Sequence, residues 1–215
     1  MTVEVKICGL DRAESVDAAV NAGAKFLGFV FYPPSPRNLT PDQASGLTVR
    51  VPAHVKSVGL FVNPTDRMIS DTLNVNELDL IQLHGEETPE RLIEIKKITN
   101  LELIKVIKIS NIRDLNSIYE YESMSDWIMF DASAPEDLEG ALPGGNALSF
   151  DWEILKDAQI NRPWMLAGGL NSKNVINAIK ISGARVVDVS SGVEKKPGVK
   201  STQMIESFIN IVQGK

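Results

Sequence analysis

Eight short apolar runs alternate with longer segments of helical periodicity from one end of the chain to the other. This alternation predicts repeated strand-helix units, which build a parallel sheet. Strands of a parallel sheet are covered on both faces, and most of the runs are accordingly rich in Val, Ile, Leu and Phe. The expected strands are Val3–Cys8, Phe26–Phe31, Ser57–Val62, Leu78–Leu83, Glu102–Ile109, Trp127–Asp131, Trp164–Ala167 and Val186–Val189.

Signals for the ends of helices fall between these strands. The segment Thr40–Gln43 has the order of a capping box with proline at the first helical position. Asn63-Pro64 and Thr88-Pro89 repeat the arrangement of a capping residue before proline, and Gly23 and Gly183 are suited to end helices in a left-handed conformation. The longest stretch without a pattern is Ala132–Ser149, and loops of that length are often functional.

The order of elements predicts one α/β domain over residues 1–215, folded as a (β/α)8 TIM barrel. An open doubly wound sheet is the main structural alternative. The barrel is preferred because it accounts for eight repeats and because small or polar residues cluster where each strand ends. In a barrel those ends converge on one face, which is where such enzymes carry their active sites.

Composition excludes several classes of function. The formal net charge is −6, so the chain lacks the basic character of a nucleic-acid-binding protein, and an anionic ligand would have to be held locally. Its single cysteine, Cys8, cannot form an intramolecular disulfide, which suits a reducing compartment. No apolar stretch approaches the length of a membrane span, and the N-terminus lacks the pattern of a signal peptide. We therefore expect a cytoplasmic protein that does not bind membranes.

Two turns predict a phosphate site. Gly168 and Gly169 lack Cβ atoms, so a ligand can approach their backbone closely, while Ser190, Ser191 and Gly192 offer hydroxyl and amide groups after the last strand. The loops after the seventh and eighth strands are the frequent phosphate site of such barrels. The alternative is that the glycines only permit tight turns.

Cys8 is a candidate general base. It ends the first strand, and the alternation of side chains along a strand places Lys6 on the same face. A modest lowering of the thiol pKa by Lys6 would make Cys8 a usable base near neutral pH. A buried, inert thiol is the alternative.

Other polar residues at the strand ends are candidates for acid catalysis or substrate binding. Asp131 ends a buried strand, where a carboxylate is costly unless it is solvated or paired, which favours a general acid or a ligand contact. Asp188 occupies a similar position and could bind a sugar hydroxyl or orient other groups. Gln82 and His84 end the fourth strand and are expected to contact substrate. The only other histidine, His54, lies in an expected loop well before the third strand, so a histidine-based metal site is not expected.

Arg37 is a candidate carboxylate clamp. It follows the proline-rich segment Pro33-Pro34-Ser35-Pro36, which stiffens the loop, and its planar guanidinium suits bidentate binding of a carboxylate. A surface cation is the alternative.

Seven short motifs at barrel spacing resemble the phosphoribosylanthranilate isomerase family of tryptophan biosynthesis. The resemblance runs from the first strand to the last helix. The motifs are Lys6–Leu10, Phe29–Arg37, Val58–Asn63, Ile81–Gly85, Phe130-Asp131, Leu166–Leu170 and Asp188–Glu194.

The resemblance implies an Amadori rearrangement of phosphoribosyl anthranilate, a small-molecule substrate, without cofactor or metal. It implies that Asp131 is the general acid, protonating the ribose ring oxygen so that the furanose opens to a Schiff base. Cys8 would then be the general base, removing the proton from the adjacent sugar carbon to give an enolamine. Arg37 would face the anthranilate carboxylate.

One segment departs from the family pattern. The family often has Gly-Gly-Thr-Gly where this chain has Gly144-Gly145-Asn146-Ala147. Asparagine can replace threonine as a polar contact. Alanine takes the backbone angles that are open to glycine only at a cost in energy, so Ala147 is an expected site of strain.

Two other functions remain alternatives. Barrels that isomerise phosphoribosyl intermediates of histidine biosynthesis are similar in shape and chemistry, but they are expected to have an aspartate in place of Cys8 and a longer, twofold phosphate arrangement. A non-catalytic barrel that binds a sugar phosphate would show no turnover, and the presence of both Cys8 and Asp131 speaks against it. The sequence leaves open whether the protein is a monomer or a homodimer.

Overall fold

The computed structural model describes residues 2–134, 142–156 and 158–215, and these form a closed barrel of eight parallel strands. The barrel closes where β1 pairs with β8, from Glu4 beside Val186 to Ile7 beside Val189. The predicted fold class is confirmed, and each predicted strand end lies within two residues of the observed one. The strands are β1 (Glu4–Cys8), β2 (Phe26–Phe31), β3 (Lys56–Phe61), β4 (Leu80–Leu83), β5 (Glu102–Ile109), β6 (Trp127–Ala132), β7 (Trp164–Leu166) and β8 (Val186–Val189).

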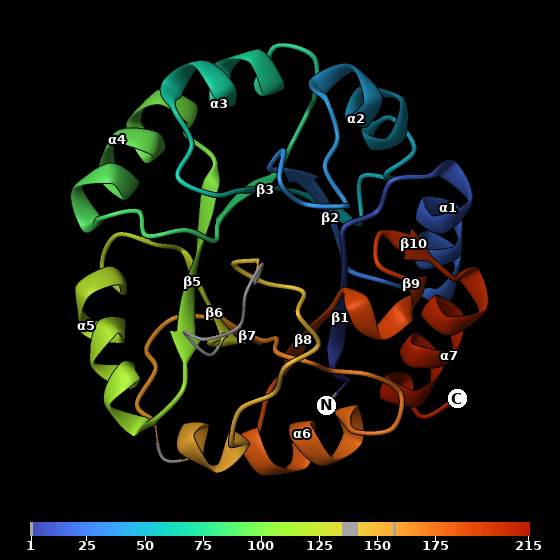
Figure 1. The fold of residues 1–215 in the computed structure, drawn as a ribbon, viewed down its shortest axis with the longest axis vertical. Helices are drawn as coiled ribbons and strands as arrows, with labels where there is room; N and C mark the ends of the chain where they lie inside the picture. Colours follow the sequence, from blue (N-terminus) through green and yellow to red (C-terminus); the bar gives the residue numbers. More distant parts are fainter. Residues whose placement is uncertain (1, 135–141, 157) are drawn as a thin grey trace.

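The helices surround the strands (Figure 1). The α-helices are α1 (Ala13–Ala22), α2 (Pro41–Thr48), α3 (Asp66–Leu73), α4 (Pro89–Thr99), α5 (Ser117–Tyr121), α6 (Val175–Ser182) and α7 (Thr202–Gln213). The 3-10 helices are η1 (Ile112–Asn116), η2 (Trp152–Leu155) and η3 (Ser191–Val193). Residues 135–141 of the long segment after β6 lie outside the described residues, and η2 is the helical element in its described part.

The capping signals are confirmed at two helices and wrong at a third. The Thr40 side chain caps α2 in a capping box with Gln43, and the Thr88 hydroxyl caps α4. The Asn63-Pro64 pair does not begin α3, which is capped by Thr65. Asn63 instead adopts a left-handed conformation with φ of 46°, which asparagine tolerates better than most residues. Its Oδ1 accepts a hydrogen bond from the Glu86 amide at 2.8 Å, so Asn63 joins two loops at the mouth of the barrel.

The barrel interior and the helix layer form separate apolar clusters. Residues on the inner faces of the strands, including Phe26, Val58, Leu80 and Met129, fill the lower part of the barrel. A larger cluster lies between the sheet and the helices, where Phe208 of α7 is fully buried. Above the inner apolar layer, the fully buried Lys6 marks the change to a polar mouth.

A two-stranded antiparallel hairpin follows β8 and was not predicted. Its strands are β9 (Glu194–Lys196) and β10 (Val199–Lys200), and Lys200 pairs in register with Glu194. The hairpin lies between the barrel and α7 (Figure 1). It therefore places two charged residues beside the carboxyl ends of β1 and β8.

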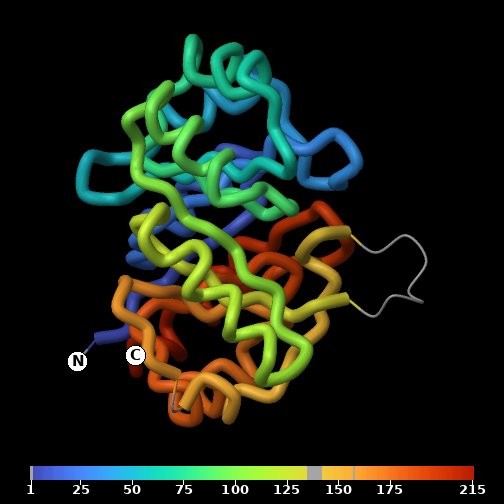
Figure 2. Tube along the Cα trace, turned by 90° about the vertical axis from the view of Figure 1, so that its left-hand side faces the viewer, coloured from blue at the N-terminus to red at the C-terminus, as the bar shows by residue number. Residues whose placement is uncertain are grey.

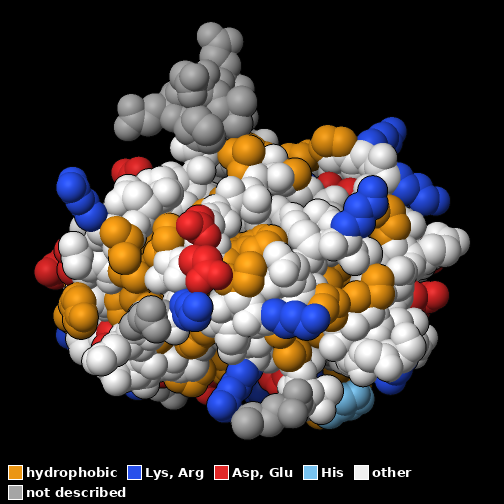
Figure 3. Space-filling model, turned by 90° about the horizontal axis from the view of Figure 1, so that it is seen from below, with side chains coloured by type: hydrophobic (Ala, Val, Ile, Leu, Met, Phe, Trp, Pro, Cys, Tyr) orange, Lys and Arg blue, Asp and Glu red, His pale blue; other side chains and the backbone are white. Residues whose placement is uncertain are grey.

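The chain termini and the loops that follow the strands lie at opposite ends of the barrel. Both chain termini lie at one end, on the left of the side view in Figure 2, and the loops that follow the strands lie at the other. On the side seen in Figure 3, charged side chains of both signs are interspersed with hydrophobic ones, and neither sign forms a continuous patch among the residues described there. Within the described ranges, none of the helices combines the length and apolar character needed to cross a bilayer.

Candidate active site

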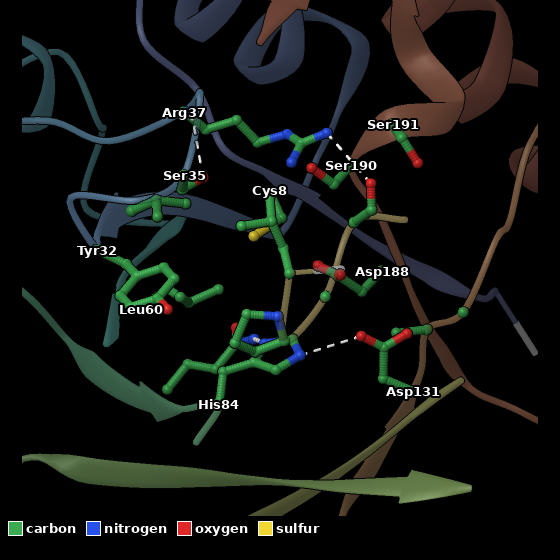
Figure 4. Close-up of a pocket in the computed structure, with 18 of the residues that line it drawn as sticks. Cys8, Tyr32, Ser35, Arg37, Leu60, His84, Asp131, Asp188, Ser190 and Ser191 are labelled. Carbon is green, nitrogen blue, oxygen red and sulfur yellow. Dashed lines mark hydrogen bonds and ion pairs between the residues drawn. The ribbon is translucent and has the colours of Figure 1, made fainter. Parts of the chain in front are cut away.

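A pocket at the carboxyl ends of the strands brings together ten of the eleven predicted site residues. Those that line it are Cys8, Arg37, Gln82, His84, Asp131, Gly168, Gly169, Asp188, Ser190 and Ser191. Figure 4 shows Cys8 near the centre, with Arg37 and Ser190 on one side and His84 and Asp131 on the other. The cysteine thus lies between a side that carries Arg37 and a side that carries the Asp131 carboxyl group.

Gly192 is the predicted residue that does not line the pocket. A Cβ atom on Gly192 would lie 2.0 Å from the carbonyl oxygen of Leu170. Only glycine therefore allows the turn after β8 to pack against the turn after β7. Its role is to bring the two turns together.

Cys8 is buried, with 4% of its surface exposed, and shares its strand face with Lys6 as predicted. A Cβ atom on Gly28 would lie 2.9 Å from the Cys8 Sγ and 3.3 Å from the Lys6 Nζ, so both atoms depend on the glycine in β2. Lys6 donates to Asp188 Oδ1 at 2.6 Å. This pair accounts for a cation that is fully buried inside the barrel.

The lowering of the Cys8 pKa that Lys6 could supply is not present in the free protein. Burial raises the pKa of the Cys8 thiol, and this outweighs the lowering by Lys6, because the carboxylate of Asp188 opposes it. Burial alone would lower the pKa of Lys6, but Asp188 and Cys8 hold that pKa above its ordinary value. The resting state is therefore a neutral thiol beside a charged Lys6–Asp188 pair.

Asp131 is the last residue but one of β6 and is held by a short chain of side chains. Its Oδ2 lies 3.0 Å from His84 Nε2, and His84 Nδ1 lies 3.0 Å from Gln82 Nε2 (Figure 4). With Gln82 donating to Nδ1, the His84 Nε2–H donates to the carboxylate. The buried Oε1 of Gln82 has no hydrogen-bond partner among the described residues. Rotation of the Gln82 amide by half a turn would let its Oε1 accept a hydrogen bond from His84 Nδ1–H. His84 Nε2 could then accept a hydrogen bond from a protonated Asp131.

Arg37 is 5% exposed, so the alternative of a surface cation is wrong. Its Nε donates to Glu194 Oε1 at 2.7 Å and its Nη2 to Glu194 Oε2 at 2.9 Å. The predicted bidentate geometry is therefore present, but towards a carboxylate of the protein itself. The hydrogen bonds among the described residues leave Nη1 unused, and this atom lies beside Gly145. One edge of the guanidinium remains for a ligand.

The two predicted phosphate turns have the backbone shapes that glycine allows. Gly168 and Gly169 have φ of 88° and 60°. A Cβ atom on Gly168 would lie 2.9 Å from the Ala132 amide nitrogen, and one on Gly169 would lie 2.7 Å from the Leu148 carbonyl oxygen. The glycines are thus required for the turn itself, and the turn forms one wall of the pocket together with Ser190 and Ser191.

The variant segment Gly144–Ala147 closes over the acid. A Cβ atom on Gly144 would lie 2.5 Å from His84 Nε2 and 2.9 Å from Asp131 Oδ2. The Asn146 side chain makes two hydrogen bonds to the backbone of Leu142. Its Oδ1 accepts from the Leu142 amide, and its Nδ2 donates to the Leu142 carbonyl oxygen. Ala147 has φ of 59°, which confirms the expected strain.

Ala147→Gly is expected to raise the free energy of unfolding by about 0.5–1 kcal/mol. The relief of left-handed strain, worth roughly 1–2 kcal/mol, exceeds the added entropy of the unfolded chain, about 0.4–1 kcal/mol. Chemical denaturation measures the change. Ala18→Gly, in the interior of α1, is the matched control and should instead destabilise by about 1 kcal/mol. A loss of stability in both variants would contradict strain at Ala147.

Several residues at the pocket were missed in the sequence. Tyr32, Leu60 and Val62 form apolar lining, and Glu194 and Lys200 lie behind Arg37 and Ser190. Tyr32, Leu60, Val62 and Glu194 lie within the motifs that carry the family resemblance, but their residue types gave no reason to single them out, and Lys200 lies outside those motifs. Within residues 2–134, 142–156 and 158–215, no three His, Cys, Asp or Glu side chains are grouped so that they could hold a metal ion.

Comparison with known proteins agrees with this geometry. The family profile described as N-(5'phosphoribosyl)anthranilate (PRA) isomerase matches residues 5–211. The N-(5'-phosphoribosyl)anthranilate isomerase of Paramagnetospirillum magneticum is 48% identical over 214 residues, covering 100% of this chain and 99% of the relative. That of Paracoccus denitrificans is 49% identical over 209 residues, covering 97% of this chain and 96% of the relative.

Solved structures give the same result. The phosphoribosyl anthranilate isomerase of Thermotoga maritima superposes with a TM-score of 0.87 at 37% identity, covering 99% of this chain and 100% of that one. Another phosphoribosyl anthranilate isomerase structure, in complex with reduced 1-(o-carboxyphenylamino)-1-deoxyribulose 5-phosphate, has a TM-score of 0.84 at 36% identity, with the same coverage. The histidine-pathway alternative is not favoured. The chain belongs to the N-(5'-phosphoribosyl)anthranilate isomerase family, the enzymes that isomerise phosphoribosyl anthranilate in tryptophan biosynthesis.

Proposed function

We propose that the pocket performs this isomerisation with Asp131 as general acid and Cys8 as general base. The observation that supports it best is that both residues line one pocket together with Arg37 and the glycine and serine turns. Asp131 donates a proton to the ring oxygen of the ribose as the C1–O bond breaks, which gives a protonated Schiff base. Cys8 then removes the proton from C2, the electrons form the enolamine, and tautomerisation gives the aminoketose. Protons and electrons balance, so the reaction needs no cofactor.

The resting thiol of Cys8 is consistent with this order of steps. The Schiff base formed in the first step carries a positive charge next to C2 and makes that carbon more acidic. Lys6 lies on the thiol side of the pocket and favours the thiolate electrostatically. Asp188 holds Lys6 in place and lines the pocket, where it is suited to accept a hydrogen bond from a sugar hydroxyl.

Gln82 and His84 support the acid in this proposal. The chain from Gln82 through His84 fixes the carboxyl group of Asp131 towards the pocket. Because either amide orientation of Gln82 matches one protonation state of Asp131, the chain can accommodate the acid before and after it gives up its proton. Both residues also line the pocket and can contact the substrate.

The substrate is proposed to lie across the pocket. Gly168, Gly169, Ser190 and Ser191 hold the phosphate, with Gly192 packing their turns together. The unused edge of Arg37 binds the anthranilate carboxylate, and the reacting carbons lie between Cys8 and Asp131, which line the same pocket (Figure 4).

Turnover of phosphoribosyl anthranilate generated in situ tests the function. Loss of the substrate's fluorescence in the presence of the intact protein is the expected result. Absence of turnover with intact ligand binding would instead support a non-catalytic sugar-phosphate-binding barrel. Turnover of the histidine-pathway aminoaldose in preference to phosphoribosyl anthranilate would support the other isomerase.

Arg37→Ala is expected to raise KM for phosphoribosyl anthranilate by about 10–100-fold with a smaller effect on kcat, because a charge-assisted hydrogen bond contributes about 1.5–3 kcal/mol. Steady-state kinetics measures the split. Arg12→Ala removes a cation whose side chain is 60% exposed and serves as the matched control, with unchanged kinetics. An unchanged KM in Arg37→Ala would count against the clamp.

We further propose that residues 1–215 act as one catalytic domain in the cytoplasm, as a monomer or homodimer. One similar structure from Thermotoga maritima is titled as mutually generated monomers of a dimeric phosphoribosylanthranilate isomerase. Sedimentation equilibrium of the purified protein decides between the two states.

A further inference from the structure

The β9–β10 hairpin carries two charged side chains that the proposed reaction does not use. The Glu194 side chain is 3% exposed and that of Lys200 is 0% exposed, whereas the neighbouring Lys195 and Lys196 face solvent. Burial of charge is costly unless the groups are paired and hydrogen-bonded. The two residues must therefore be explained by what they contact.

Each carboxylate oxygen of Glu194 accepts two hydrogen bonds. Oε1 accepts from Arg37 Nε and from Lys200 Nζ, each at 2.7 Å. Oε2 accepts from Arg37 Nη2 at 2.9 Å and from the Gly198 amide at 3.2 Å. The guanidinium is thus fixed in plane by two bonds to one carboxylate, which is itself fixed by the hairpin.

Lys200 extends this network to the phosphate turn. Besides Glu194, its Nζ donates to the carbonyl oxygen of Ser190 at 3.0 Å and to the Ser190 hydroxyl at 3.1 Å. The three protons of the ammonium group thus have three acceptors. Arg37 and Ser190, which lie on the same side of Cys8 in Figure 4, are thus joined through two side chains of one hairpin.

The hairpin is also packed directly on the loop that carries Arg37. Gly198 has φ of 77°, and a Cβ atom there would lie 2.6 Å from the Pro36 carbonyl oxygen. On the other side, a Cβ atom on Gly9 would lie 2.5 Å from Arg37 Cδ. The aliphatic part of the Arg37 side chain is therefore confined by Gly9, and its guanidinium by Glu194.

The charges leave a net positive site. Arg37 and Lys200 share the single carboxylate of Glu194, so this cluster carries one positive charge in excess while Lys200 is protonated. Burial lowers the pKa of Lys200, and the carboxylate of Glu194 opposes that lowering. Although burial opposes ionisation of Glu194, the bonds from Arg37 and Lys200 hold the pKa of that carboxyl below its ordinary value, so it is charged when it orients the guanidinium. An anionic ligand then meets a cation of fixed orientation, which costs less to organise on binding than a mobile one.

We propose that Glu194 and Lys200 are positioning residues that fix the Arg37 guanidinium relative to the Ser190 turn, and thereby make the pocket selective for a sugar phosphate whose aromatic amine carries a carboxylate. This inference rests on the proposed function, since it assigns the carboxylate to Arg37 and the phosphate to the turn. Glu194 acts on the carboxylate end, and Lys200 acts on both ends.

The competing explanation is that Glu194 only neutralises Arg37. In that case Glu194→Gln would free the guanidinium and strengthen binding of a carboxylate. If Glu194 orients the guanidinium, the same change weakens that binding, because an amide offers one acceptor oxygen where two are used. The two explanations predict opposite signs.

The test measures calorimetric binding of two stable ligands to the intact chain and its variants. One is reduced 1-(o-carboxyphenylamino)-1-deoxyribulose 5-phosphate, and the other is the same compound made from aniline, which lacks the carboxylate. Glu194→Gln should weaken the first at least about tenfold more than the second. Lys200→Met should weaken both ligands, since it also releases the Ser190 turn.

The control is Glu206→Gln, the same change at an exposed position of α7, which should leave both affinities unaltered. Equal losses for both ligands in Glu194→Gln, or tighter binding of the carboxylate ligand, would overturn the inference. Thermal melting shows whether each variant is folded, and Glu194→Asp, which keeps the charge, should recover part of the selectivity. The ratio of the two affinities is independent of turnover, so failure of the isomerase assay in the intact protein would contradict the proposed function separately.

Discussion

Asp131→Asn is expected to lower kcat for phosphoribosyl anthranilate by about 10²–10⁴-fold, the usual contribution of a general acid. Asparagine has nearly the same shape and keeps an oxygen that can accept from His84 Nε2, so the loop over the acid stays in place. What is lost is the proton for the ring oxygen, and ring opening becomes the slow step. Stopped-flow fluorescence of the substrate measures the rate.

The control for this variant is Asp126→Asn. Asp126 lies just before β6, while Asp131 is the last residue but one of that strand, so the two positions test the same change near opposite ends of one element. Asp126 pairs with Lys96 and is distant from the pocket lining, so its replacement should affect stability and leave kcat unchanged. Equal kcat in Asp131→Asn and the intact protein would remove Asp131 from the mechanism.

The barrel was predictable because its signals are local. A parallel strand such as Phe26–Phe31 is buried along its whole length, which yields an uninterrupted apolar run. The polar residue after each run then marks the mouth, and closure of the sheet brings these residues together without any further information. Cys8 and Asp131 could therefore be placed in one pocket although they lie far apart in sequence.

The errors concern quantities that depend on distant contacts. The partner of Arg37 is Glu194, 157 residues away, on a hairpin too short to leave a pattern in the sequence. The direction of the Cys8 pKa shift depends on the balance between burial and two opposite charges, and the sequence indicated only the lysine. Asn63 was expected to begin a helix because it precedes proline, but Thr65 provides the cap and Asn63 the left-handed turn.

Cys8→Ala is expected to lower kcat by about 10²–10⁴-fold as well, but at a different step. With Asp131 intact, the ring can still open, whereas the C2 proton has no acceptor. Substrate deuterated at C2 separates the two variants. The isotope effect should be larger in Cys8→Ala than in Asp131→Asn, because only the former is limited by breaking of the C2–H bond.

The pH dependence gives an independent test of the same base. Only the thiolate accepts a proton, and burial raises the thiol pKa, so kcat/KM of the intact protein should still be rising with pH where an ordinary cysteine is already ionised. Because Cys8 is the only cysteine, the pH dependence of its alkylation measures this pKa directly, and the two profiles should share one midpoint. A Cys8→Ala variant that keeps the alkaline limb of the profile, or turns over within about threefold of the intact protein, would show that another group takes the C2 proton.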